Sequence, residues 1–430
     1  MHMSKQSRGI KPILGVFAIL VLLCGSYRVC HAYSILTHEE IVDLLWADQI
    51  KPLLMARYPH ATEEELLKAH AYAYGGCLIQ DMGYYPFGNK VFSDMVHYVR
   101  SGDFVQALLD EATDVNEYAF ALGALAHYVS DTVGHPVVNA SVAREYPKLK
   151  AKYGPSVTYA EDKKAHIRVE FGFDVVQVAK QRYTSDTYRA FIGFEIAKPV
   201  LQRAFLKTYG IRLEDVFTNL DLSIGSFRWA VSRAIPEMTK VAVETKKDEM
   251  VRENPSFAKN KFLYNLKRSE YEKEWGKNYQ KPGFGARFMA AIFKIIPKVG
   301  PFKAIAFKMP YPDTETAYLK SVNDTVDRYR SCLRVLKNKD DVALVNADFD
   351  TGKPTRSGEY SLADETYAKL LDKLADSKFS GLSHDLGKDI LDFYQDPNAP
   401  NAIKKKPDRW NKTMAELDQL KATQVAAAYY

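Results

Sequence analysis

The chain has 430 residues, of which 47% are hydrophobic and 26% are charged, a balance typical of a globular protein long enough for two domains. This composition, which contains no low-complexity tract, excludes a disordered or fibrous protein. The net charge of +6 falls to +2 without the first 32 residues, which hold four basic and no acidic side chains. Charge therefore gives no argument for nucleic-acid binding.

Residues 1–32 have the three parts of a secretory signal peptide. Basic side chains precede an apolar run at 13–24, which is short for a membrane span, and the small residues Cys30 and Ala32 stand at the −3 and −1 positions of a cleavage site. We expect cleavage after Ala32 and a mature chain that begins at Tyr33 and is secreted or periplasmic. If the signal is not cleaved, it anchors the protein in a membrane.

Between residues 38 and 245 the apolar residues recur at helical spacing, and several segments open with a threonine cap followed by acidic side chains. No segment alternates with the period of a strand. The pattern predicts an all-α domain over residues 33–245, with helices at 37–54, 61–78, 103–112, 116–134, 165–183, 187–210 and 215–247.

The composition changes near residue 245, and we predict an additional, mainly helical C-terminal region, 246–430, to which the sequence assigns no role. Helical spacing returns at 317–337 and 362–376. The apolar stretch 286–310 carries lysines at intervals. It is either an amphipathic segment that makes peripheral contact with a membrane or a core segment whose lysines reach the surface.

Two cysteines follow the predicted signal peptide, Cys77 and Cys332. In an oxidising compartment they could pair, but two cysteines so far apart are neither a disulfide framework nor a thiolate zinc site. Any metal in this protein must therefore be held by histidines and carboxylates.

The sequence "ALAHYVSDTVGHP" places His127, Asp131 and His135 four residues apart, on one face of the predicted helix. The two histidines lie about 12 Å apart along the helix axis, so one ion cannot contact both. The spacing therefore suggests two neighbouring ions with Asp131 between or bridging them. Because Pro136 disfavours helical geometry in the residue before it, we expect His135 at the helix end.

A second predicted helix has the same spacing, with His166 and Glu170 four residues apart on one face. A single histidine in a helical pattern usually has a structural role. Five of the eight histidines after Ala32, however, fall within 130 residues and have carboxylates nearby at helical offsets: His38, His97, His127, His135 and His166. Their joint pattern with carboxylates indicates metal binding, whereas His60, His70 and His384 lack such partners. The further candidates upstream are His38, Asp81 and His97.

The order of these ligands resembles the zinc-dependent phospholipase C family. Relatives include the N-terminal domain of glycosylphosphatidylinositol-specific phospholipase D and, more distantly, the trinuclear-zinc lecithinases and fungal single-strand nucleases. The resemblance covers residues 33–175 well and extends loosely to about 245. It implies a multi-helix bundle that binds two or three zinc ions and hydrolyses a phosphodiester.

The resemblance also implies a role for each candidate residue. Asp81 would orient or deprotonate the attacking water, or act as a ligand. The terminal amine and carbonyl of Tyr33 would bind metal, and Tyr33 precedes His38 by five positions, as the N-terminal tryptophan does in the nuclease relatives. The ligand sets would be His97, His127 and Asp131 for one zinc, His135, His166 and Glu170 for a second, and Tyr33, His38 and Asp131 for a third.

The spacing between Asp131 and His135 departs from part of the family. Three residues separate them here, against five in the lecithinases and nucleases, and the shorter spacing looks more like the phospholipase D-type domain. The sequence therefore does not determine the headgroup of the substrate or which P–O bond is cleaved.

The leading hypothesis is a secreted zinc-dependent phosphodiesterase that hydrolyses phospholipids, in the manner of a phospholipase C, with a zinc-activated water. The alternatives are phospholipase D-type cleavage of an inositol-containing lipid anchor, a zinc-dependent nuclease or nucleotidase, and a non-catalytic metal-stabilised envelope protein. The near-neutral charge after Ala32 argues against nucleic acid as a specific partner. No residue pattern indicates an oligomeric state.

Overall fold

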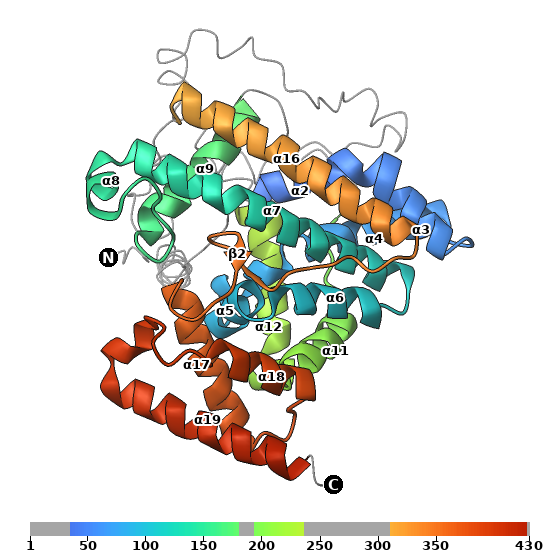
Figure 1. The fold of residues 1–430 in the computed structure, drawn as a ribbon. Coiled ribbons are helices and arrows are strands. Elements are labelled where there is room, and N and C mark those ends of the chain that lie inside the picture. Colours follow the sequence, from blue (N-terminus) through green and yellow to red (C-terminus); the bar gives the residue numbers. More distant parts are fainter. Residues whose placement is uncertain (1–34, 180–192, 236–309, 428–430) are drawn as a thin grey trace, which may run out of the picture.

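The structure is a computed structural model that describes residues 35–179, 193–235 and 310–427. Its longest helix, α7 (Val115–Glu145), runs through the middle of the molecule and is flanked by the others (Figure 1). The helix begins at Asp114, whose carboxylate accepts hydrogen bonds from the backbone N–H groups of Asn116 and Glu117. Most of the residues of α7 are buried, so this helix forms the centre of the core.

Helix α4 (Glu63–Gly76) packs directly against α7. It starts with a capping box between Thr62 and Glu65, as the sequence pattern predicts. A Cβ atom on Gly123 of α7 would lie 2.1 Å from the carbonyl oxygen of Ala73 in α4. The absence of a side chain at Gly123 therefore allows the two backbones to touch.

The remaining described helices before residue 235 surround this pair. The segment predicted at 37–54 is helical throughout, with a π-helical turn in its middle. The elements are α2 (Ile35–Leu45), η1 (Trp46–Ile50), α3 (Lys51–Arg57), η2 (Ile79–Tyr84), α5 (Lys90–Tyr98), α6 (Ser101–Glu111), α8 (Pro147–Tyr153), α9 (Lys163–Ala179), α11 (Lys198–Tyr209), η3 (Leu213–Asp215), α12 (Leu220–Trp229) and η4 (Ala230–Ala234).

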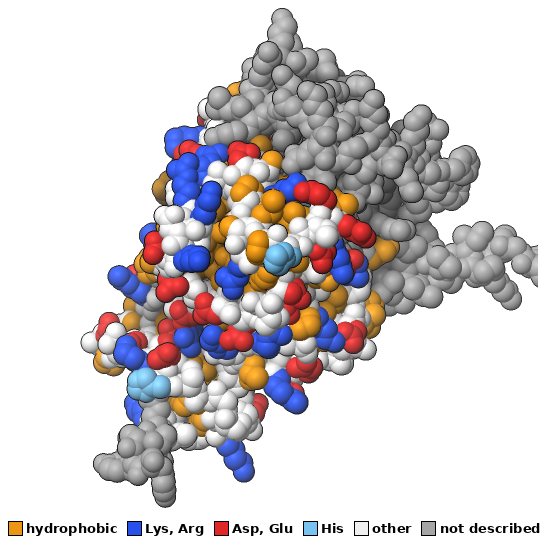
Figure 2. Space-filling view, turned by 90° about the vertical axis from the view of Figure 1, so that its right-hand side faces the viewer, with side chains coloured by type: hydrophobic (Ala, Val, Ile, Leu, Met, Phe, Trp, Pro, Cys, Tyr) orange, Lys and Arg blue, Asp and Glu red, His pale blue; other side chains and the backbone are white. Residues whose placement is uncertain are grey.

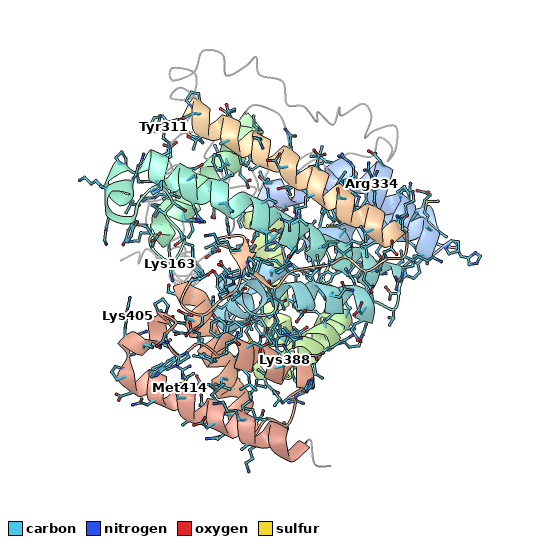
Figure 3. The ribbon with its side chains drawn as sticks, viewed as in Figure 1. Lys163, Tyr311, Arg334, Lys388, Lys405 and Met414 are labelled. Atoms are coloured by element: carbon cyan, nitrogen blue, oxygen red, sulfur yellow. The ribbon has the colours of Figure 1, made fainter. Side chains whose placement is uncertain are left out.

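The C-terminal region packs on these helices in two parts. Helix α16 (Pro312–Lys337), with Tyr311 and Arg334 near its two ends in Figure 3, lies along α7. The chain then returns across the molecule to a two-residue antiparallel pair, β1 (Ala347–Asp348) and β2 (Lys353–Pro354) (Figure 1). The last helices gather at one end of the molecule: α17 (Ser361–Asp376), α18 (His384–Phe393), η6 (Ala402–Lys405) and α19 (Pro407–Ala427).

The predicted all-α class is confirmed, since β1 and β2 are the only strands in the described part of the chain. One predicted helix, 187–210, is wrong at its start, because residues 193–197 are not helical and α11 begins at Lys198. Gly193 has a φ of +86°, and Pro199 suits the first turn of a helix better than its interior. The predicted signal peptide, the domain boundary near 245 and residues 286–309 lie outside the described residues.

The prediction that His135 lies at a helix end is also wrong, because α7 continues through Pro136 to Glu145. A proline at this position removes the hydrogen bond that the carbonyl oxygen of Thr132 would accept. Gly352, with a φ of +68°, comes so close to that oxygen that a Cβ atom would lie 2.3 Å from it. The C-terminal region thus covers the backbone group that Pro136 leaves without its helical partner.

No helix within the described ranges is long and apolar enough to cross a membrane. Cys77 is buried in the core and Cys332 lies on α16, and no disulfide joins them.

Replacing Gly352 by alanine tests this packing. We expect Gly352→Ala to lower the free energy of unfolding by roughly 1–3 kcal/mol, because the new side chain is strained at positive φ and meets the Thr132 carbonyl. Gly225→Ala is the matched control, because Gly225 lies inside α12 and its Cβ would contact nothing within 4 Å. The control should be neutral or stabilise by about 0.5–1 kcal/mol. Urea denaturation measures both, and a wild-type midpoint for Gly352→Ala would contradict the expectation.

Candidate metal centre

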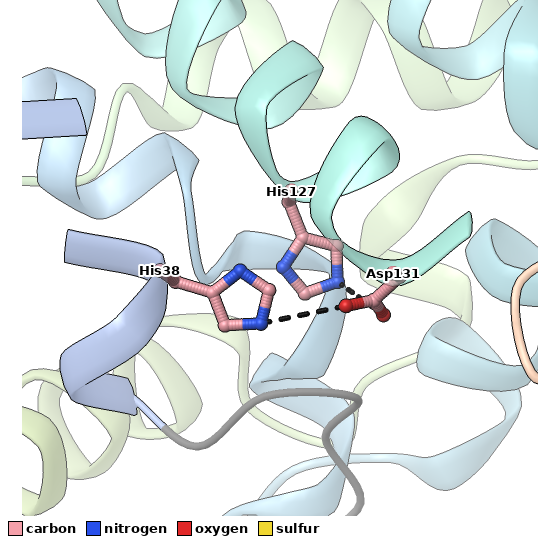
Figure 4. A group of neighbouring side chains, drawn as sticks. All are labelled: His38, His127 and Asp131. Carbon is pink, nitrogen blue, oxygen red and sulfur yellow. Dashed lines mark ion pairs between the residues drawn. The ribbon is translucent and has the colours of Figure 1, made fainter. Parts of the chain in front are cut away.

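Four elements bring five of the predicted ligands into one buried cluster. His38 comes from α2, Asp81 from η2, His97 from α5, and His127 and Asp131 from α7. All five side chains are fully buried. Asp131 lies between the imidazoles: its Oδ1 is 3.4 Å from Nε2 of His38, and its Oδ2 is 3.1 Å from Nε2 of His127 (Figure 4).

The spacing of these atoms suits a shared cation. In a tetrahedral zinc site with metal–ligand bonds of about 2.0–2.1 Å, two ligand atoms lie about 3.3 Å apart. Nε2 of His97 is 3.4 Å from Oδ1 of Asp81 and 3.6 Å from Oδ2 of Asp131. Two groups have all their ligand atoms within 4.8 Å of one another: His38, His127 and Asp131, and Asp81, His97 and His127.

Backbone carbonyls fix which nitrogen each imidazole presents. Nδ1 of His97 lies 2.7 Å from the carbonyl oxygen of Ser93, and Nδ1 of His127 lies 2.9 Å from that of Cys77. A carbonyl only accepts, so Nδ1 carries the proton and Nε2 keeps its lone pair for a cation. Each histidine therefore offers one ligand atom, directed at Asp131.

His38 is held by contacts of the residues just before it. The carboxylate of Asp174 in α9 accepts hydrogen bonds from the backbone N–H of Leu36 and the hydroxyl of Thr37, each at 3.0 Å. The Thr37 hydroxyl also lies 2.7 Å from that of Tyr318 in α16. The His38 ring stacks on His127 with centroids 4.5 Å apart. Tyr33, the remaining predicted ligand, lies outside the described residues.

The other three predicted ligands form a second buried cluster farther along α7. The rings of His135 and His166 have centroids 5.4 Å apart, and Nδ1 of His166 is 2.7 Å from Oε1 of Glu170. His135 and His166 are fully buried, and Glu170 is 2% exposed. These three side chains are neighbours, but they are not among the groups whose ligand atoms all lie within 4.8 Å.

Buried atoms without hydrogen bonds show that both clusters fit a cation. Leaving a buried polar atom without a partner normally costs about 1–3 kcal/mol. Within the described residues, none of the following has a hydrogen-bond partner: Nε2 of His97, His127 and His135, both carboxylate oxygens of Asp131, Nδ1 of His166 and Oε1 of Glu170. Imidazole nitrogens and carboxylate oxygens are the donor set that zinc binds.

The pKa shifts of Asp131 and His97 indicate which side chains are charged when no metal is bound. Burial raises the pKa of Asp131, but the neighbouring His127 and His135 outweigh it and hold that pKa well below its usual value. Burial also lowers the pKa of His97, yet the neighbouring carboxylates of Asp131 and Asp81 raise it to about 10. A cation must therefore displace protons that these carboxylates already attract.

Comparison with known proteins places this cluster in a family. Residues 37–219 match the family model described as zinc dependent phospholipase C. The match covers less than half of the chain, and this part is similar to the zinc-dependent phospholipase C family. The resemblance found in the sequence is thus confirmed, and the family match together with the histidine–aspartate groups supports a phospholipase-like, zinc-dependent function. Comparison with curated proteins and with solved structures gave no significant match.

Sequence reasoning missed the contribution of the C-terminal region, which lies beyond the phospholipase C match. The Phe349 ring lies 5.1 Å from that of His97, centroid to centroid, and the backbone N–H of Phe349 donates to the carbonyl of His97 at 3.1 Å. Oδ1 of Asp350 is 3.0 Å from Nδ1 of His135. No spacing in the sequence links these residues to the histidines, because they lie more than 200 positions from His135.

We expect zinc uptake by the phospholipase C domain to release protons. With a pKa of about 10, His97 of the metal-free protein is protonated at neutral pH and must deprotonate before Nε2 binds a cation. Zinc affinity should therefore rise with pH, by up to about tenfold per unit for this proton, between about pH 6 and pH 9. The same shift stabilises the metal-free fold fully below the unfolded pKa of about 6.5, and this stability is lost as the pH rises through about 10.

Chelator competition at several pH values measures the affinity, and calorimetry in buffers of different ionisation enthalpy counts the protons released. The exposed His60 supplies a control, since His60→Ala should keep the wild-type pH dependence. An affinity that does not change over this pH range would contradict the assignment of His97.

Proposed function

We propose that this protein is a zinc-dependent phosphodiesterase that hydrolyses phospholipids in the manner of a phospholipase C. The observation that carries the proposal is the position of Asp131. Its two oxygens face Nε2 of His38 on one side and Nε2 of His127 and His97 on the other, at separations of 3.1 to 3.6 Å that ligands of a shared metal ion can have. Phosphodiester hydrolases use such neighbouring sites to hold both the attacking and leaving oxygens.

The geometry supports a division of the ligands among two or three zinc ions. His127 can join only one ion, because its Nδ1 is occupied by the carbonyl of Cys77. We assign His97, His127, Asp81 and Oδ2 of Asp131 to one zinc. Oδ1 of Asp131 and His38, with the backbone of Tyr33, are assigned to a second, and His135, His166 and Glu170 to a third.

Zinc bound here would lower the pKa of a coordinated water toward about 7 and polarise the phosphoryl oxygen. The chain's own residues supply the setting for that chemistry. Asp131 and Asp81 place negative charge beside the histidines, and burial keeps bulk water from weakening these interactions. The sequence left Asp81 as either a base or a ligand. Its membership of one group with His97 and His127 favours the ligand role.

The face shown in Figure 2 offers no support for a nucleic-acid substrate. On the face shown in Figure 2, basic and acidic side chains are interspersed over the described residues, without a continuous basic stripe. A protein that tracks a nucleic-acid backbone needs such a stripe. We further propose that the protein is secreted or periplasmic and that segment 286–310 makes peripheral contact with the membrane.

A second candidate function is a metal-stabilised envelope protein without turnover. The observation that favours it is the closure of the site: His38, His97, His127 and Asp131 have no exposed surface, and the Phe349 ring lies beside His97. A phosphodiester must reach the metal ions to be cleaved, whereas a structural metal is normally enclosed.

The test is hydrolysis of phosphatidylcholine vesicles by the mature protein, with and without chelator. We expect chelator-sensitive release of diacylglycerol, and a loss of more than about 100-fold in His127→Ala and in Asp131→Ala, because each removes a direct ligand. His60→Ala, a surface histidine outside the cluster, should retain full activity.

The product and substrate decide among the alternatives. Release of phosphatidic acid would change the assignment to a phospholipase D-type reaction, and cleavage of single-stranded DNA alone would change it to a nuclease. Stoichiometric zinc without cleavage of either substrate would favour the structural role. Wild-type turnover in the His127 and Asp131 variants would refute the metal centre.

A further inference from the structure

The C-terminal region sends one segment, residues 347–352, into the cluster of His135, His166 and Glu170. Asp350 is fully buried there, although it lies far beyond the phospholipase C match. Its Oδ2 accepts a hydrogen bond from the hydroxyl of Tyr98 at 3.0 Å and another from that of Tyr360. A buried carboxylate held at one oxygen by two hydroxyls is fixed in orientation, so its other oxygen is aimed at a defined place.

That place is Nδ1 of His135. The carbonyl oxygen of Phe349 lies 2.8 Å from it and accepts its hydrogen bond, so Nδ1 must carry the proton. Oδ1 of Asp350 lies 3.0 Å from the same nitrogen as its ion-pair partner. The opposite nitrogen, Nε2, is buried and has no hydrogen-bond partner among the described residues. The segment thus sets the tautomer of His135 and leaves Nε2 as its ligand atom.

The same segment also fixes the tautomer of His166, and it does so through Asn139. The side-chain amide of Asn139 donates to the backbone carbonyl of Asp350 at 2.7 Å, which turns its own Oδ1 toward Nε2 of His166, 2.9 Å away. Nε2 of His166 therefore carries the proton, and Nδ1 keeps its lone pair beside Glu170. Two imidazoles from two different helices are oriented by two consecutive residues of the C-terminal region.

We propose that Asp350, with the carbonyl of Phe349 and through Asn139, is a positioning residue that orients His135 and His166 to bind a cation such as zinc. Carboxylates and carbonyls that hold the distal nitrogen of a ligating histidine fix its ring and raise its basicity. The site of the phospholipase C domain is therefore completed by a segment outside that domain. This inference rests on the metal ligation proposed above for His135, His166 and Glu170.

The experiment compares zinc content and zinc affinity among variants of the full mature chain. We expect Asp350→Ala to weaken the binding of one zinc ion by about 10–100-fold, the usual effect of removing a partner of a ligating histidine. Asp350→Asn should lose less. Its amide oxygen keeps a negative partial charge beside Nδ1 of His135, and its NH2 group can donate to the hydroxyls of Tyr98 and Tyr360, which also accept.

Asp348→Asn is the matched control. Asp348 is buried on the same segment, but its oxygens accept from the backbone N–H and the hydroxyl of Thr351, not from a histidine. It should keep wild-type zinc content. Circular dichroism and gel filtration show whether each variant is folded, and the Asn variants keep the comparison valid if Asp350→Ala is not.

A double-variant cycle separates positioning from folding. If Asp350 acts through His135, then Asp350→Ala adds no further loss of zinc in a His135→Ala background. Asn139→Ala should weaken the same ion as Asp350→Ala does. Wild-type zinc affinity in Asp350→Ala would overturn the inference, and so would an equal loss in Asp348→Asn. An equal loss in Asp350→Asn and Asp350→Ala would overturn it in favour of Asp350 as a direct ligand.

The zinc measurements distinguish failure of the positioning role from failure of the proposed metal centre. If the wild-type protein binds no zinc, the metal centre itself is refuted. If the wild type binds two or three ions and the Asp350 variants bind as many with equal affinity, only the positioning role is refuted.

Discussion

The structure depends on one buried carboxylate. Asp131 is fully enclosed on α7, where an isolated charge would be costly, and the imidazoles of His38, His97 and His127 converge on it. In the metal-free protein the proton on His97 offsets part of this charge, as the raised pKa of His97 indicates. A cation would offset the same charge without that proton. The cluster is therefore stable only as a set, which explains why helices α2, α5 and α7 must meet at this point.

The periodicity of the helix places most of the candidate ligands on one face, so most of them can be predicted from the sequence. Residues four apart on α7 share a face, and this relation alone places His127, Asp131 and His135 in order along the site. The all-α class follows from the same periodicity. The pairing of His166 with Glu170 on α9 is local as well. What the spacing does not contain is the approach of α2 and α5, which depends on packing between segments distant in the chain.

The errors of prediction have local and tertiary origins. The start of the 187–210 helix is misplaced although Gly193 and Pro199 are local signals, whereas the other differences depend on contacts between distant segments. A proline disfavours helical geometry in the residue before it, yet α7 passes through Pro136, and Gly352 packs against the carbonyl oxygen of Thr132 at this point. The carbonyls of Ser93 and Cys77, which fix the imidazole tautomers, belong to the backbone and leave no trace in the residue types. Asp350 is a carboxylate without a periodic partner, so nothing in the sequence separates it from an ordinary surface aspartate.

The segment 347–352 joins these observations. Its Gly352 packs against the carbonyl oxygen of Thr132, and its Asp350 contacts the histidine that immediately precedes Pro136. Without the segment, Nδ1 of His135 would lose both the carbonyl oxygen of Phe349 and the neighbouring carboxylate of Asp350. The C-terminal region thus packs against α7 at the second cluster and supplies the groups that contact His135 there.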